Sequence, residues 1–282
     1  MDPKYGKFRT VSVLLSLLLA AAPGGAVFAG IIGHQPVPIL VQPTASVTPV
    51  GVPLWREGQS LYAISPAVAL TAPTAYGADW GQFFLALGGS NTRSSDVSDG
   101  SAALGMGVGN ADSLALEGML SIISLTGDDY VQGFNFKLHR RFTQDLAAAI
   151  GTENVFTSGG AGKTPSSEYV AVSGRLKTDL GGLGQLRLIG TVGVGNERFG
   201  VLKNNPVRNE GKEAFAALAW FPHEAVSLLG EYVGGQTNVG ISVAPLGDYP
   251  VVVTAVAYDL SDRFEFSGSQ ADYGLALGYS FR

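Results

Sequence analysis

Basic side chains recur at every second position in several stretches of the sequence, where small or apolar residues fill the other positions. In an extended strand these basic residues share one face, opposite the apolar side chains. Their chemistry would be the recognition of ions, because a basic ring inside a pore favours anions. The candidate ring residues are Lys137, Arg141, Arg175, Lys177 and Arg187. The alternative is that these basic residues form salt bridges with acidic residues across the interior of such a pore and close it.

Acidic residues follow the same alternation. On the expected strands they would lie on the face of the basic residues, within the bore or nearer its outer mouth. These residues are Glu117, Glu153, Glu231 and Asp272. They are therefore the candidates for neutralising the basic ring.

We expect no covalent chemistry. The three histidines of the chain are His34, His139 and His223, and no G-x-S-x-G motif is present. His139 would lie between the cations Lys137 and Arg141, a poor setting for a general base. Three scattered histidines and no cysteine give no metal-ligand spacing. The sequence thus predicts a protein that is not an enzyme and has no cofactor or metal.

The elements that position these residues are strands. Twelve stretches alternate in polarity or suit a strand, and most are about ten residues long, the length of a tilted strand that crosses a bilayer. All five prolines after Gly77 fall between these stretches, as expected for strands paired on both sides. The expected starts are near residues 79, 101, 113, 131, 145, 168, 184, 212, 224, 237, 249 and 270. The stretches 212–221 and 249–258 alternate poorly, so their register is the least defined.

The connections favour one antiparallel up-and-down barrel over residues 77–282. Short turns alternate with longer polar or Gly-rich loops, as in a membrane barrel with short turns at its periplasmic end. An even number of strands places both ends of the barrel at the short-turn end. The last strand should pair with the first, near residues 79–88, because closure removes the exposed edges.

The apolar face should meet lipid. The chain is only 15% charged, against about 25% in soluble domains, and the opposite face is mostly Gly, Ala and Ser. Aromatic residues are expected in two girdles at the strand ends. They are Trp80, Phe142, Trp220, Phe221 and Tyr279 at the short-turn side, and Tyr130, Tyr232, Tyr258 and Tyr273 at the other. A soluble secreted barrel with its apolar face inside is the alternative.

The end of the chain carries a family resemblance. Apolar or aromatic residues occupy every second position from Tyr273 to Phe281: Tyr273, Leu275, Leu277, Tyr279 and Phe281. This pattern resembles the C-terminal insertion signal of bacterial outer-membrane β-barrels. The resemblance covers residues 77–282 and implies that barrel-insertion machinery reads the last strand. Arg282 departs from it, because the aromatic residue is normally last.

The N-terminal part differs in kind. Residues 1–29 read as a cleaved signal peptide, with Lys4, Lys7 and Arg9 before an apolar stretch and a small-residue cleavage site at Val27–Ala29. Residues 30–76 hold seven prolines and read as an extended leader. The leader would either stay in the periplasm, where it could bind a partner, or fold into the barrel as a plug.

We therefore expect a porin-like barrel in the outer membrane of a Gram-negative-type bacterium. It would act as a narrow passive channel for ions or small polar solutes, with the lipid bilayer as its main partner. The competing hypothesis is a non-conducting structural or export-associated barrel whose leader binds a periplasmic partner or fills the lumen. A net charge of -5 gives no reason to expect nucleic acid as a partner.

Overall fold

The computed structural model describes residues 52, 65–92, 97–123, 125, 131–159, 166–181, 184–201, 210–246, 249–258, 260 and 271–281. Every described residue belongs to one compact unit, Pro36–Arg282. The predicted signal peptide and most of the predicted leader lie outside the described residues. Within the part of the chain that the structure describes, no helix has the length and apolar character needed to cross a membrane.

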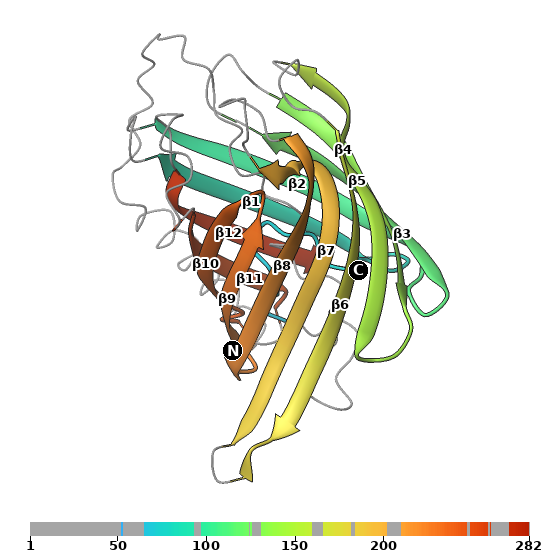
Figure 1. Ribbon diagram of the computed structural model, residues 1–282, viewed down its shortest axis with the longest axis vertical. Helices are drawn as coiled ribbons and strands as arrows, with labels where there is room; N and C mark the ends of the chain where they lie inside the picture. The colour runs from blue at the N-terminus through green and yellow to red at the C-terminus, as the bar shows by residue number, and fades with distance from the viewer. Residues whose placement is uncertain are drawn as a thin grey trace, which may run out of the picture. The chain divides into compact units, whose positions relative to one another are not determined.

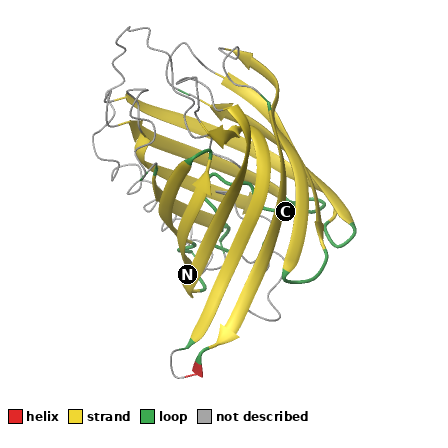
Figure 2. Ribbon diagram, in the orientation of Figure 1, coloured by secondary structure: helices red, strands yellow, loops and turns green. Residues whose placement is uncertain are grey.

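The described residues form twelve strands in one closed antiparallel barrel, in which each strand pairs with its neighbours in sequence (Figures 1 and 2). This confirms the predicted fold class. Each strand begins within four residues of its expected start. The strands are β1 (Phe83–Thr92), β2 (Val97–Asn110), β3 (Leu114–Ile123), β4 (Val131–Arg141), β5 (Leu146–Gly159), β6 (Ser167–Asp179), β7 (Gln185–Val201), β8 (Glu210–His223), β9 (Val226–Val233), β10 (Gln236–Val243), β11 (Val251–Ala257) and β12 (Ala271–Phe281).

The barrel closes between β1 and β12. Their register runs from Phe83 opposite Phe281 to Thr92 opposite Ala271, with one irregularity at Asn91/Thr92. The rings of Phe83 and Phe281 stack at the seam, with centroids 5.4 Å apart. This pairing confirms the closure expected from the alternation of the last strand.

The apolar face points outward. Along β4, Asn135, Lys137 and His139 are buried inside the barrel, while the alternating residues Phe136 and Leu138 are exposed on its outside. The same division holds on β12, where Tyr273, Leu275, Tyr279 and Phe281 are exposed. On these two strands the structure therefore places the large apolar side chains where lipid would lie.

The core of this barrel lies within its lumen. Residues 65–78, which we call the lumenal segment, are all buried, and in Figure 1 they run inside the barrel before β1 begins. Apolar side chains from the segment and from the wall form the buried clusters, for example Leu70 with Phe221 and Ala72 with Phe215. The segment thus takes the place that a small barrel normally fills with its own side chains.

This core explains why two strands lacked clear alternation. On β8, Phe215, Ala217 and Ala219 face the lumen, whereas Leu218 and Trp220 face outward. On β11, Val252 and Val256 also face inward. Both faces of these strands are apolar because one meets the lumenal segment, so polarity alone could not define their register.

Candidate functional site

The lumenal segment enters at the short-turn end of the barrel. The backbone N–H of Ala67 donates to Ser242 Oγ at 2.9 Å, and Ser227 Oγ donates to the carbonyl of Ala67 at 2.6 Å. Ser227 is near the start of β9 and Ser242 is near the end of β10, and the two residues are opposite each other in the register. Both serines are fully buried, and they fix the first limb of the segment against the β9–β10 hairpin.

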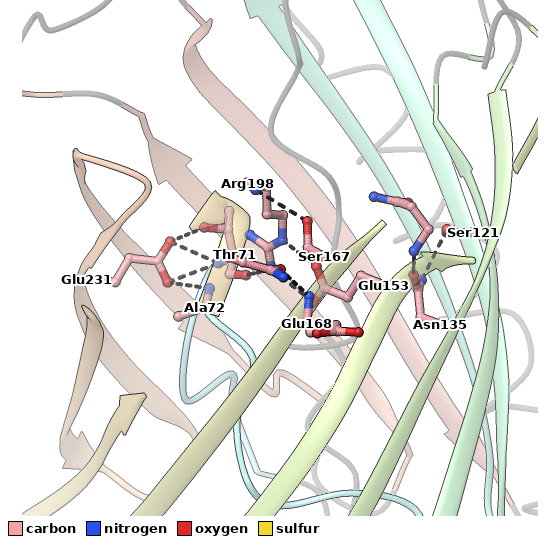
Figure 3. Close-up of polar contacts among 11 residues, drawn as sticks. Thr71, Ala72, Ser121, Asn135, Glu153, Ser167, Glu168, Arg198 and Glu231 are labelled. Atoms are coloured by element: carbon pink, nitrogen blue, oxygen red, sulfur yellow. Dashed lines mark hydrogen bonds and ion pairs between the residues drawn. The ribbon is translucent and has the colours of Figure 1, made fainter. Parts of the chain in front are cut away.

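A single carboxylate holds the bend of the segment. Glu231 of β9 accepts the backbone N–H groups of Leu70, Thr71 and Ala72 at 2.9 to 3.0 Å. It also accepts the Thr71 hydroxyl at 2.5 Å and the side-chain amide of Asn238 at 2.9 Å. Successive N–H groups that converge on an anion form a nest. Here the nest belongs to the lumenal segment and the anion to the wall (Figure 3).

An arginine binds the same bend from the opposite side of the nest. Arg198 forms a two-pronged ion pair with Glu153 and donates from Nη2 to the carbonyl of Thr71 at 3.1 Å (Figure 3). The pair is largely buried. Bidentate arginine–carboxylate pairs combine strength with fixed geometry, so the wall grips the Thr71 peptide group through both its N–H and its C=O.

Backbone irregularities bring this pair into the lumen. Asn154, Phe156 and Glu197 have φ values of 57°, 55° and 50°, in the left-handed region. The pairing of β4 with β5 shifts register between Gln132 and Phe136, and that of β7 with β8 shifts after Asn196. Such bulges re-aim side chains. As a result the consecutive residues Glu153 and Asn154 are both buried in the lumen.

The second limb returns along β6, β4 and β3. Ala75 N–H donates to Ser173 Oγ at 2.8 Å, and Lys137 Nζ donates to the carbonyl of Tyr76 at 2.7 Å. Ala78 N–H donates to Glu117 Oε2 at 2.8 Å, and its carbonyl lies 3.1 Å from His139 Nε2. The segment therefore makes a U inside the barrel, with both limbs at the short-turn end and the bend in the outer half.

The structure separates the predicted ring residues into two groups. Lys137 lies in the middle of the lumen, where it pairs with Glu117 at 2.9 Å and binds the lumenal segment. The other four residues lie at the short-turn end of the barrel. Arg141 pairs with Asp112 at 2.7 Å and Arg175 with Asp145 at 2.6 Å, and both of these acids belong to short turns.

The remaining two ring residues lie on a projecting hairpin. Lys177 faces Arg187 across β6 and β7, beyond the last residues of β6 and β7 that pair with β5 and β8. Figure 1 shows these two strands extending past their neighbours. Arg187 donates to Gln185 at 3.1 Å and lies 3.9 Å from Glu224. The effect of these charges on ion preference stays a prediction, and the Asp272 side chain lies outside the described residues.

Small residues of the lumenal face lie beneath large ones. Aromatic rings lie directly over them: a Cβ at Gly105 would be 2.1 Å from Phe84, and a Cβ at Gly193 would be 2.1 Å from Phe215. The rings of Phe199 and Phe215 stack with centroids 4.9 Å apart. Glycine is required here because the rings occupy the space that any side chain would fill.

Two residues expected in the aromatic girdles also face inward. Phe221 is fully buried in the lumen, and Tyr258 packs against the same apolar cluster. In contrast Trp80, Phe142, Trp220, Tyr232, Tyr273 and Tyr279 are exposed on the outside as expected, and Tyr130 lies outside the described residues. The sequence held one indication that Phe221 faces inward. Phe221 directly follows Trp220, and adjacent residues on a strand point to opposite faces, so only one of the two could belong to the girdle.

Comparisons with known proteins yield fold neighbours of low similarity. No family model matches the chain, and no curated protein sequence matches it. A COG4313 outer membrane channel from Pseudomonas putida F1 is 14% identical, with a TM-score of 0.38 over 74% of this chain and 96% of that chain. The N-terminal β-barrel domain of Pseudomonas aeruginosa OprF is 12% identical, with a TM-score of 0.16 over 71% and 97%. At these scores the likeness does not bear on the function of this chain.

Proposed function

We propose that the chain is an outer-membrane β-barrel that forms a narrow passive passage for ions or small polar solutes, and that the lumenal segment closes this passage. It has no enzymatic role in this proposal. The observation that carries it is the set of wall side chains, led by Glu231 and Arg198, that bind the backbone of the segment across the lumen. Such contacts are polar and specific, so they can be broken without unfolding the strands.

Insertion into a membrane is supported by the outer face of the barrel. Leu138, Ile150, Val170 and Val194 occupy neighbouring positions on β4 to β7 and are 39%, 57%, 48% and 49% exposed. Hydration of apolar surface costs about 25 cal/mol per Å², and hydrocarbon removes that cost. The protein should therefore stay with the outer-membrane fraction after carbonate washing. Release by carbonate alone would support a soluble barrel instead.

Conductance in planar bilayers tests the passage. The Glu231→Ala variant removes the acceptor of three backbone N–H groups and should give larger or more frequent step currents than the native protein. Glu168→Ala is the matched control, because Glu168 is exposed on the outside of β6 and should leave the currents unchanged. Heat-modifiable migration on gels would show that each variant is a folded barrel.

One observation favours a non-conducting barrel as the second candidate. Phe199, Phe215 and Tyr169 form a packed ring cluster in the lumen, and this cluster belongs mainly to the wall rather than to the segment. If folded, inserted Glu231→Ala protein shows no step currents, the wall itself blocks the lumen. The barrel would then be structural or export-associated, and the passage proposal would be rejected.

A further inference from the structure

We infer that the lumen wall is a binding site for a U-shaped peptide rich in small residues, recognised mainly through its backbone. The lumenal segment occupies this site in the structure, and a second peptide of the same kind can bind there when the segment is displaced. This inference rests on the proposed function for its electrical readout, although the site itself is defined by contacts that do not depend on conduction.

The wall forms hydrogen bonds with backbone atoms along the whole lumenal segment. It binds the N–H groups of Ala67, Leu70, Thr71, Ala72, Ala75 and Ala78, and the carbonyls of Ala67, Thr71, Tyr76 and Ala78. The Thr71 and Tyr76 hydroxyls add side-chain contacts. Groups that bind N–H and C=O are indifferent to residue type. The wall therefore selects a backbone path rather than a sequence.

Size limits which side chains the site accepts. Ala67, Ala72, Ala75 and Ala78 are each completely buried. A Cβ at Gly77 would be 2.7 Å from both His139 Nε2 and Lys137 Cε. Close packing of this kind excludes larger residues at these positions, whereas the site accommodates the larger buried residues Val68, Leu70 and Tyr76 at theirs. The ligand class is therefore a peptide rich in Ala, Gly, Ser and Pro.

Proline positions in the segment match the hydrogen bonds of the wall. Proline has no N–H, and neither proline occupies a position whose N–H binds the wall: Pro66 precedes Ala67, which binds Ser242, and Pro73 lies between Ala72 and Ala75, which bind Glu231 and Ser173. Proline also restricts the backbone before binding, which reduces the entropy lost on binding. A proline placed at 71 or 72 would instead remove a donor to Glu231. Two peptides of identical composition should therefore differ in affinity: prolines at positions 66 and 73 allow binding, whereas prolines at 71 or 72 weaken it.

The native lumenal segment is covalently attached to β1, so an experiment with a free peptide must first displace it. A segment attached to β1 has an effective concentration in the millimolar range, so a free peptide competes poorly with it. Two variants displace the segment and leave every wall residue intact. Thr71→Pro with Ala72→Pro removes three donors to Glu231, the two backbone N–H groups and the Thr71 hydroxyl. Ala75→Trp places a large ring at a completely buried position.

A synthetic peptide of residues 65–78 is the probe. Added to the short-turn side of a bilayer that contains either variant, it should block the step currents, because both limbs of the native segment lie at that end. A matched peptide with prolines at 71 and 72 should need at least about tenfold more for the same block, since two backbone hydrogen bonds and that of the Thr71 hydroxyl to the Glu231 carboxylate are lost. Thr71→Ala in the peptide should change the block less than the two prolines do.

The outcomes separate this inference from the proposed function. Variants that conduct while the native peptide leaves the current unchanged, or that both peptides block equally, would overturn the peptide site and leave the passage standing. Folded variants that do not conduct would overturn the passage instead. In that case, anisotropy of a fluorescent native peptide with detergent-solubilised variant decides the peptide site. Saturable binding weakened by the two prolines supports the site, and its absence rejects it.

Discussion

At the scale of single residues, Glu231 shows how a barrel can bury a carboxylate in its lumen. The side chain is only 5% exposed, and burial of an unpaired charge would be costly. The three backbone N–H groups, the Thr71 hydroxyl and the Asn238 amide offset that cost because hydrogen bonds to a charged acceptor are stronger than those to a neutral one. Glu231 thus holds the bend through the N–H groups of the segment, while Arg198 binds the Thr71 carbonyl.

The Glu117–Lys137 pair gives a stability prediction at this scale. Lys137→Met leaves a buried carboxylate without its cation and should destabilise the barrel by about 3–5 kcal/mol, whereas Glu117→Gln combined with Lys137→Met should recover much of the loss. Urea unfolding in lipid vesicles, followed by tryptophan fluorescence, measures both variants. A loss below about 1 kcal/mol for the single variant would show that the pair contributes little.

Asp112 gives a pH prediction. The hydrogen bond from Arg141 lowers the pKa of the Asp112 carboxyl from its ordinary value of 3.8. A carboxyl with a depressed folded-state pKa stabilises the fold above its unfolded pKa, and this contribution is lost as pH falls through the folded pKa. Native protein should therefore be slightly more stable than Asp112→Asn at neutral pH, with the difference vanishing at the acid end of the range. Thermal unfolding between pH 2 and 7 checks this, and a difference that persists in acid would contradict it.

At the scale of elements, adjacent strands of the wall pair a large residue with a glycine on their lumenal faces. Phe84 of β1 lies over Gly105 of β2, and Phe215 of β8 lies over Gly193 of β7. Each pair fills the lumen beside the segment without thickening the wall. The same packing therefore explains both the poor alternation of β8, which carries a large ring on its lumenal face, and the glycines of β2 and β7, which lie beneath such rings.

Gly193→Leu tests this pairing. The new side chain would meet the Phe215 ring and should destabilise the barrel by about 1–3 kcal/mol through overpacking. Gly230→Ala is the control, because a Cβ there meets open space, and its effect should stay within about 0.5 kcal/mol. Equal unfolding midpoints in urea for the two variants would mean that the Phe215 ring can move aside.

The projecting β6–β7 hairpin carries a selectivity prediction. Arg175 and Arg187 lie at the short-turn end, on the side from which ions would enter the lumen. In a conducting background such as Glu231→Ala, Arg175→Glu with Arg187→Glu should shift the preference toward cations. Reversal potentials under a salt gradient measure the shift. An unchanged potential would show that these arginines do not act on the permeating ion.

At the scale of the whole molecule, closure of the barrel depends on its first and last strands. Phe281 stacks on Phe83 and lies 5.7 Å from the ring of Tyr279. Phe281→Ala should slow insertion and lower the fraction of heat-modifiable barrel, because it weakens both the seam and the expected insertion signal. Ser280→Ala, on the opposite face of the same strand, is the control. Normal assembly of Phe281→Ala would leave the signal assignment without support.

The sequence by itself determined the barrel. Alternation shows which face of a strand is apolar, and it was enough to locate the twelve strands. The outward direction of the apolar face followed from the low charge and small residues of the other face, and the β1–β12 closure from the need to leave no exposed edge. The same local pattern identified Lys137, Glu117, Glu153 and Glu231 as lumenal residues, and all four are buried in the lumen. These features need no knowledge of what lies across the bore.

Only the tertiary structure decided what fills the lumen. The contact between Thr71 and Glu231 joins residues 160 positions apart, and that between Ala67 and Ser242 spans 175. Residues 65–78 are mostly small and show no polar–apolar period, because every side of the segment is enclosed by the wall. A segment that is buried on all sides has no exposed face, so its sequence shows no polar–apolar alternation. Its path could therefore be known only once the closed barrel around it was known.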